Sequence, residues 1–422
     1  MKILDILANR KMLIMALFGF SSGLPVALVA GTLQAWLADE GLSIQTIGIL
    51  TLVGQPYFYK FLWAPVMDRF APMFLAKFFG RRRSWILITQ VALMVGLVWM
   101  GLSNPGQEPL LVGLVALIVA FVSASQDVVI DAYRTEILTP EERGAALALF
   151  VSCWRIAALV SGAGALILAD QLGWMATYNI MALLMLVGII ATFLAQEPDL
   201  SSTSVHRTLR EAVVAPLQDF LQRDKALLLL LLVVLYKLAD AFAAQLMTAF
   251  FTGGADIQGL GFSKTEVGLI GKGWGFAATI LGASLAGVLM IRWRLFTSLL
   301  VFGFFQAASN LMFVWLAVAG KNHTLLIATV FIENFCAGMG TTALLALLTG
   351  LCNPHFAVAQ YALLSAFAAV GTRFLGPLAG YLVAEVGWVQ FFIWSFVAAI
   401  PSLALILYMR DTIGQYDVRK KD

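Results

Sequence analysis

The stretch Gly41-Leu-Ser-Ile-Gln-Thr-Ile-Gly48 recurs as Gly261-Phe-Ser-Lys-Thr-Glu-Val-Gly268, 220 residues further along the chain. In each copy a Gly-x-Ser triplet is followed by a β-branched residue and a glycine. A second pair of segments repeats as well, because Arg155 and Arg373 each precede a glycine by seven residues and a Gly-Trp pair follows each of them. The chain is therefore predicted to consist of two repeated halves.

The composition excludes most classes of protein. Of the 422 residues, 61% are hydrophobic and 12% are charged, whereas about a quarter of the residues in a soluble domain are charged. The same figures exclude a disordered chain, and a count of only three cysteines excludes a disulfide-rich scaffold. We conclude that this is a polytopic membrane protein.

Apolar runs of about 20 residues are long enough to cross a bilayer. Such runs lie at 12–38, 45–67, 84–102, 110–134, 143–170 and 176–195, and again at 227–252, 265–290, 296–319, 324–350, 357–384 and 389–409. The polar stretch between the two sets predicts a linker, helical near its end, so that the chain divides into 1–195, 196–226 and 227–422. Two parallel six-helix halves are typical of major facilitator transporters. We predict an all-α membrane protein with the major facilitator fold and twelve transmembrane helices.

The charges in the connections predict the orientation. Twenty of the 27 Lys and Arg residues lie in the two termini and in the loops on the same side, whereas only Lys264 and Lys321 lie in loops on the other side. Because cytoplasmic loops carry an excess of Lys and Arg, both termini are predicted to be cytoplasmic. The net charge of +3 comes from these loops and does not indicate a nucleic-acid partner.

The loop between the second and third runs contains Pro65-Val-Met-Asp-Arg69 and, after an insertion, Gly80-Arg-Arg-Arg83. This pattern resembles the loop motif of facilitators, in which an acid at a helix end and a basic cluster latch one open state. The candidate cytoplasmic gate consists of Asp68, Arg69, Arg81 and Arg82. A positive-inside anchor explains the arginines equally well, although it does not explain Asp68.

Nine ionisable side chains lie within the apolar runs. They are Lys60, Asp127, Asp131, Arg155, Lys237, Asp240, Lys272, Glu333 and Arg373. Each needs a partner or water, because a charge at bilayer depth costs about 3 kcal/mol. Five are basic and four are acidic, and a surplus of cations suits an anionic solute.

Asp127 and Asp131 stand four residues apart, on one face of a helix. Two carboxylates on one face repel each other when both are ionised, which favours a proton on one of them. A carboxyl group that exchanges a proton inside the membrane is what proton coupling requires, so both are candidates and Asp127 is preferred. At 1.5 Å per residue, Asp127 and Arg155 lie about 14 Å and about 18 Å from the cytoplasmic surface, so they could pair.

The second half offers similar pairs. Glu333 and Arg373 lie at similar depths, and Lys237 can neutralise Asp240 three residues further along its helix. Each of these two pairs, like the pair of Asp127 with Arg155, is either a structural ion pair or part of a substrate site.

Helix one is interrupted at Ser21-Ser-Gly-Leu-Pro25. This interruption marks either a substrate path or a simple kink. Further along, Gln34 and Trp36 could contact a sugar, while an aromatic belt at the membrane edge is the alternative for Trp36.

These segments together resemble the AmpG family of muropeptide permeases. The matching stretches, as they stand in this chain, are Phe20-Ser-Ser-Gly-Leu-Pro25, Gly31-Thr-Leu-Gln-Ala-Trp36, Lys60-Phe-Leu-Trp-Ala-Pro65, Ser123-Ala-Ser-Gln-Asp127, Glu141-Glu-Arg-Gly-Ala145, Leu235-Tyr-Lys-Leu-Ala-Asp240, Glu333-Asn334, Gly338-Met-Gly340, Leu351-Cys-Asn353 and Ala362-Leu-Leu-Ser365. The related acetyl-CoA transporter family resembles the first-half stretches too, whereas the second-half stretches favour the muropeptide family. Some members of the family run longer at the C-terminus, with further hydrophobic segments that this chain lacks.

The resemblance implies proton-coupled import of GlcNAc-1,6-anhydro-MurNAc, with or without its stem peptide, across the bacterial inner membrane. The activity serves peptidoglycan recycling and, in some bacteria, β-lactamase induction. Asp127 becomes the proton carrier, and the implied substrate contacts are Gln126, Arg155, Lys237, Glu333, Asn334 and Arg373. To these contacts we add Gln34, Lys60, Asp240 and Lys272. The expected partners are an aminosugar or glycopeptide, protons and the lipid bilayer, with the proton gradient as driving force, no cofactor, no metal, no nucleic acid and a monomeric state.

Three alternatives stay open. The first is transport of another anionic solute such as acetyl-CoA. The second is a membrane-embedded enzyme, but Gly271-Lys272 lacks the spacing and the following Ser or Thr of a phosphate loop. The third is a non-transporting sensor, against which the short loops argue. We therefore expect a transporter rather than an enzyme.

Overall fold

The computed structural model describes residues 9–72, 75–139, 142–198, 215–353 and 357–417. These residues form helices and turns, and no strand occurs among them, which confirms the all-α class. By their contacts the residues form two compact units. The first unit comprises Met1–Leu42, Val53–Ser204 and Ser263–Leu269, and the second comprises Ser43–Leu52, Val205–Phe262 and Ile270–Asp422. Each unit thus contains one short segment from the other half of the sequence.

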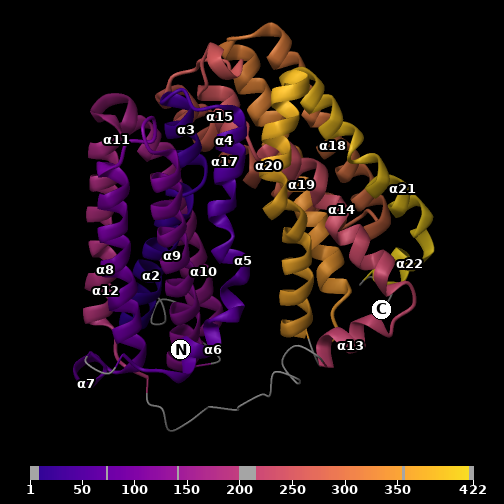
Figure 1. Ribbon diagram of the computed structural model, residues 1–422. Coiled ribbons are helices and arrows are strands. Elements are labelled where there is room, and N and C mark those ends of the chain that lie inside the picture. The colour runs from indigo at the N-terminus through magenta and orange to yellow at the C-terminus, as the bar shows by residue number, and fades with distance from the viewer. Residues whose placement is uncertain (1–8, 73–74, 140–141, 199–214, 354–356, 418–422) are drawn as a thin grey trace. The chain divides into compact units, whose positions relative to one another are not determined.

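The first unit is built on long helices joined by short ones. Its elements are α2 (Arg10–Leu28), α3 (Gly31–Asp39), α5 (Pro56–Tyr59), η2 (Lys60–Leu62), α6 (Ala64–Arg69), α7 (Ala76–Phe79), α8 (Arg81–Leu102), α9 (Pro109–Ile137), α10 (Arg143–Leu159), η3 (Val160–Gly164), α11 (Ala165–Leu184), α12 (Leu186–Leu194) and α16 (Lys264–Glu266). Helix α2 packs against α9, α10 and α12, and Figure 1 shows α2, α9 and α10 running alongside one another. Phe18 of α2 meets Tyr133 of α9 edge-on in the core, with the ring centroids 5.6 Å apart.

The second unit has the same kind of construction. Its elements are α4 (Ile44–Leu50), α13 (Ala215–Leu221), α14 (Ala226–Ala244), α15 (Met247–Thr252), η5 (Ala255–Ile257), α17 (Gly275–Met290), α18 (Leu295–Ala319), α19 (His323–Gly350), α20 (Ala357–Val397), α21 (Ile400–Tyr408) and α22 (Arg410–Gln415). Two further elements, η1 (Thr51–Gly54) and the π-helix η6 (Val267–Trp274), cross the limits of the units. Helix α17 packs against α19, and α14 packs against α20. The short helix α13 confirms that the linker is helical near its end.

The two sequence repeats meet in both units. In the second unit α4 packs against α20, and a Cβ on Gly48 would lie 3.0 Å from the Cα of Gly380. In the first unit a Cβ on Gly268 would lie 2.8 Å from the carbonyl oxygen of Ala163, next to Gly162. In both places the last glycine of the repeated stretch, Gly48 or Gly268, packs against a glycine-containing segment. These segments are the ones that follow Arg373 and Arg155 in the sequence. The glycines allow the backbones to approach this closely.

Polar contacts hold the segment 263–269 in the first unit. The ammonium group of Lys264 lies 2.8 Å from a carboxylate oxygen of Asp39, and Trp174 donates a hydrogen bond of 2.7 Å to the same oxygen. The hydroxyl of Thr265 donates to Asp170 over 2.6 Å. Lys264 therefore has a structural partner that its position in a loop did not suggest.

Eight helical stretches of the described chain are long and apolar enough to cross a membrane. Two of them, Ala145–Leu194 and Leu363–Tyr408, have 50 and 46 residues, and at 1.5 Å per residue each could cross about 30 Å twice. The chain turns within them at Gly173 (φ 77°) and Gly387 (φ 75°), a backbone conformation that favours glycine. These are the glycines of the repeated Gly-Trp pairs. The number of twelve helices stays a prediction.

The candidate spans turn large apolar side chains outward. Examples are Val95, Leu110 and Val288, which are 61%, 81% and 62% exposed. Exposed apolar surface of this extent is unfavourable in water and favourable in lipid. The outward faces thus suit a protein embedded in a bilayer.

Candidate functional site

The centre of the candidate site in the first unit is Asp127 on α9. Its carboxylate oxygen Oδ1 accepts a hydrogen bond from the hydroxyl of Ser22 on α2. The other oxygen, Oδ2, lies 3.9 Å from the ammonium group of Lys60, which begins η2. The Asp127 side chain is 18% exposed. Three separate elements therefore bring a carboxylate, a hydroxyl and a cation together inside the apolar spans.

A proline explains why α2 presents its polar groups to α9. Pro25 has no N–H group, so the carbonyl of Ser21 loses its usual partner within the helix. The side-chain amide of Gln126 donates a hydrogen bond to this carbonyl over 3.2 Å. Ser22 and Asp127, the next residues on the two helices, form the contact described above. Gln126 is fully buried, so its geometry favours a helix contact over a substrate contact.

The other predicted charges of the first unit lie elsewhere. Asp131 forms an ion pair of 3.1 Å with Arg134, one turn along α9, and is 48% exposed. Arg155 is exposed on α10. Among the described residues, Arg155 and Asp127 form no ion pair. The cation beside the carboxylate of Asp127 is Lys60 instead. Equal depth in the membrane was not enough to make a pair, since the side chains must also face each other.

The aromatic and amide groups of α3 have different environments. Trp36 is 2% exposed and stacks on Trp174, with the ring centroids 5.8 Å apart. It is therefore a core residue rather than a sugar platform or a belt aromatic. Gln34 is half-buried.

A polar cluster in the second unit brings together residues of η6 and α19. The side-chain amide of Asn334 donates to a carboxylate oxygen of Glu333 over 2.6 Å and to the carbonyl of Val330 over 2.9 Å. Lys272, in the π-helical turn η6, is close enough to Glu333 for an electrostatic interaction. Such π-turns are frequent at functional sites.

Lys237 on α14 contributes a second cation to this unit. Its ammonium group donates a hydrogen bond of 2.8 Å to the hydroxyl of Thr341 on α19. The side chains of Asp240 and Arg373 lie outside the described part of the structure. The predicted pairs of Lys237 with Asp240 and of Glu333 with Arg373 therefore stay predictions.

The arginines of the predicted gate bind acids of the same unit. Arg82, 3% exposed, forms two hydrogen bonds with the carboxylate of Glu136 at the end of α9, one of them 2.9 Å long. Arg81 lies 3.6 Å from the same carboxylate. Glu197 accepts hydrogen bonds of 2.8 and 3.0 Å from the backbone N–H groups of Arg82 and Arg83. The cluster ties α8, α9 and the end of α12 together, and the side chains of Asp68 and Arg69 lie outside the described part.

We expect Glu136→Gln to lower the free energy of unfolding by about 2 kcal/mol, because it leaves the buried guanidinium of Arg82 without its counter-charge. Thermal unfolding of the purified protein in detergent measures the loss. Glu108→Gln, an exposed change at the opposite end of the same helix, is the control and should have little effect. Equal stability of both variants would contradict a structural role for the Arg82 pair.

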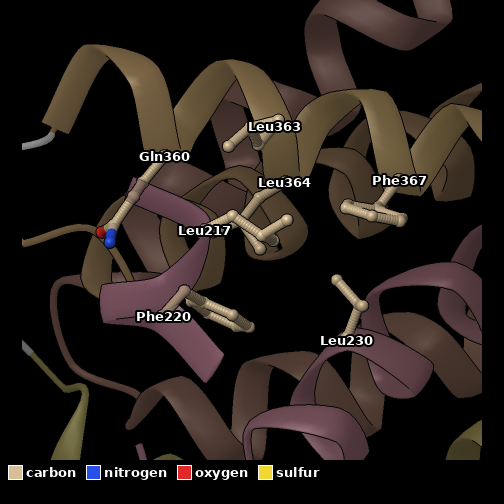
Figure 2. A pocket seen from close by; sticks show the side chains of 7 residues that line it. All are labelled: Leu217, Phe220, Leu230, Gln360, Leu363, Leu364 and Phe367. Atoms are coloured by element: carbon tan, nitrogen blue, oxygen red, sulfur yellow. The ribbon is translucent and has the colours of Figure 1, made fainter. Parts of the chain in front are cut away.

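A small pocket lies beside the linker helix α13 in the second unit. Figure 2 shows its walls, and the lining residues are Leu217, Phe220, Leu230, Gln360, Leu363, Leu364 and Phe367. A single polar side chain among seven suits the packing of a helix and not the binding of a sugar.

The polar edge of this pocket is a network around Asp219. Its carboxylate accepts hydrogen bonds from Gln360 (2.6 Å), Arg223 (3.0 Å) and Asn353 (3.0 Å). Burial alone would raise the pKa of Asp219, but the three hydrogen bonds and the Arg223 charge outweigh it and lower the pKa. The network fixes α13 to α20 and to the turn that follows α19.

We expect Asp219→Asn to lower stability by about 1 kcal/mol at neutral pH. Because the pKa is lowered on folding, the stabilisation is fully present above the unfolded value of about 4 and is lost as the pH falls through the folded value. The difference between wild type and variant should therefore shrink on acidification. Unfolding midpoints measured against pH check this, with exposed Asp224→Asn as control; a difference that is constant with pH would contradict it.

Several partners were missed by reasoning from the sequence. In the sequence Ser22 is recognisable only as part of a helix interruption, and the carbonyl freed by Pro25 is the signal that points to its surroundings. Thr341, Glu136 and Glu197 carry no local signal, because each contacts residues distant in sequence.

Comparison with known proteins gives the family. The family model of the Major Facilitator Superfamily matches residues 12–319. The anhydromuropeptide permease of Escherichia coli K12 is 48% identical over 411 residues, which cover 97% of this chain and 82% of that protein. A transporter named AmpG 1 from Rickettsia bellii is 31% identical, with coverages of 96% and 100%. The crystal structure of the nucleoside transporter NupG matches with a TM-score of 0.70 at 10% identity, over 95% of this chain and 100% of that one.

The structural likeness at such low identity concerns the fold alone, and it agrees with the predicted major facilitator fold. The sequence likeness extends over nearly the whole chain. The chain is thus a multi-pass membrane transporter that belongs to the AmpG family of the Major Facilitator Superfamily.

Proposed function

We propose that this protein imports anhydromuropeptides, GlcNAc-1,6-anhydro-MurNAc with or without its stem peptide, from the periplasm to the cytoplasm by proton-coupled alternating access. The observation that carries the substrate is the 48% identity, over 97% of this chain, to a protein named anhydromuropeptide permease. The observation that carries the coupling is the carboxylate of Asp127 inside the spans, with a cation 3.9 Å away.

The ion pair offers a physical link between proton and solute. While Asp127 is ionised, it neutralises Lys60. A proton on Asp127 removes this counter-charge, and Lys60 can then bind a carboxylate of the incoming solute. Release of the solute leaves Lys60 in need of a counter-charge, which favours return of the proton to water. Proton and anion are thus expected to move together.

The remaining polar groups are proposed as substrate contacts. In the first unit the exposed guanidinium of Arg155 suits a carboxylate, and Gln34 suits a sugar hydroxyl. In the second unit Lys237, Lys272 and the Glu333–Asn334 pair offer both charges and amide groups. Asp240 and Arg373 stay candidates from the sequence alone.

The setting of this activity also belongs to the proposal. The surplus of Lys and Arg in the loops on one side supports an inner-membrane protein with both termini in the cytoplasm. We propose that it acts as a monomer, without a cofactor, and that it moves its solute without changing it chemically.

Competition for uptake tests the substrate. Proteoliposomes take up labelled GlcNAc-1,6-anhydro-MurNAc under an inward proton gradient, with unlabelled tripeptide-bearing anhydromuropeptide or acetyl-CoA in excess. We expect the anhydromuropeptide to compete and acetyl-CoA to have no effect. If only acetyl-CoA competed, the substrate would belong to that class of anion and not to the anhydromuropeptides. If the purified protein changed the sugar chemically, the proposal that it only transports its solute would be contradicted.

A further inference from the structure

We infer that Ser22 is a positioning residue for proton transfer at Asp127, which directs one carboxylate oxygen toward Lys60 and favours the ionised form. The inference rests on the proposed proton coupling at Asp127. Its basis is the hydrogen bond from the Ser22 hydroxyl to Oδ1, opposite the ion pair that Oδ2 forms with Lys60.

The position of Ser22 is fixed from two sides. Toward α10, a Cβ on Gly19 or on Gly23 would each lie 2.3 Å from a backbone carbonyl oxygen, so α2 lies directly against the neighbouring backbone. Toward α9, the Ser21 carbonyl accepts the amide of Gln126 over 3.2 Å. Ser22 itself is 1% exposed. The hydroxyl therefore has little freedom to leave the carboxylate.

A hydroxyl is suited to this role because it serves both protonation states. It donates to an ionised carboxylate, and it accepts from a protonated one. The hydrogen bond is stronger when the carboxylate is ionised, because the charge assists it. Ser22 thus keeps Asp127 in place throughout the cycle while biasing it toward the ionised form.

The charged and titratable groups around Asp127 come from few elements. Lys60 faces it from η2, and Asp131 interacts with it electrostatically from the same helix. Asp131 in turn is paired with Arg134. Helix α5, which packs against α9, contains Tyr57 and Tyr59, and α2 has its charged residues only at its start. Ser22 is the residue through which α2 acts on the carboxylate.

The test compares Ser22→Ala with Ser22→Thr, Ser21→Ala and Asp127→Asn in proteoliposomes. The initial rate of labelled GlcNAc-1,6-anhydro-MurNAc uptake is followed as the external pH varies at a constant pH difference. Loss of the charge-assisted hydrogen bond should move the midpoint of the Ser22→Ala profile upward by about one pH unit. Ser22→Thr keeps the hydroxyl and should restore the wild-type midpoint. Ser21→Ala is the matched control, because this neighbouring hydroxyl is also buried but donates only to the Phe18 carbonyl of its own helix.

The outcomes separate the inference from the function on which it rests. The role of Ser22 would be overturned if the Ser22→Ala profile coincided with that of wild type, or if Ser21→Ala shifted the midpoint equally. The proposed coupling would still stand in that case, provided that Asp127→Asn had lost gradient-driven accumulation. Gradient-driven accumulation by Asp127→Asn would overturn both. If Ser22→Ala does not assemble, Ser22→Cys keeps the volume with a weaker donor, and an intermediate upward shift is then expected.

Discussion

Replacing Asp127 by Asn is expected to abolish uphill uptake of anhydromuropeptide. An inward gradient of one pH unit stores about 1.4 kcal/mol per proton, which supports a tenfold accumulation for each proton carried with the solute. The carboxamide of Asn cannot take up and release a proton, so the variant should reach only the external concentration. Accumulation of labelled GlcNAc-1,6-anhydro-MurNAc in proteoliposomes measures the difference.

Two comparisons make this result specific. Exchange of internal for external substrate requires no net proton movement, so Asp127→Asn should retain measurable exchange, which shows that the variant is folded. Asp131→Asn should have a smaller effect on accumulation, because Asp131 is about half exposed and is paired with Arg134. A variant that exchanges normally and still accumulates tenfold would show that the proton is carried elsewhere.

Replacing Gly23 by Val is expected to cost the largest amount of stability, about 3 kcal/mol or more. A Cβ at this position would lie 2.3 Å from the carbonyl oxygen of Trp154, and this oxygen belongs to the backbone of α10, which cannot move aside as a side chain can. Helices α2 and α10 would have to separate. That movement would also shift Ser22 relative to Asp127. Unfolding midpoints in detergent, together with the yield of monodisperse protein, measure the loss.

The control for this change is Gly287→Val. Gly287 lies in α17, and a Cβ at this position would have no neighbour within 4 Å. The same change of residue type in a helix should therefore have little effect there. If both variants unfold at the same midpoint, close packing of α2 on α10 does not limit stability.

Much of the architecture follows from the sequence because it depends on local patterns. Apolar runs, loop charges and the repeats beginning at Gly41 and Gly261 predict an all-α facilitator. The structure adds the reason for the repeats, since Gly48 and Gly268 each pack against a glycine-containing segment. The number and the bounds of the spans are harder to predict, because the helical backbone is interrupted only at single glycines, Gly173 within α11 and Gly387 within α20.

The partners within the site were less accessible to such reasoning. Depth along a helix can be counted, but the direction in which a side chain points depends on the rotation of packed helices. This is why Asp127 meets Lys60 and not Arg155. Similarly, the acids that bind Arg82 are 54 and 115 residues away, and no local pattern connects them.

Simultaneous recording of substrate and proton entry tests the central claim most directly. Proteoliposomes that contain wild-type protein and a pH-sensitive dye would receive labelled GlcNAc-1,6-anhydro-MurNAc under an inward proton gradient. We expect the sugar to accumulate together with an acidification that depends on it, and both to disappear when an ionophore collapses the gradient. Uptake of the sugar that continues unchanged after the gradient has collapsed, with no acidification, would contradict proton-coupled import.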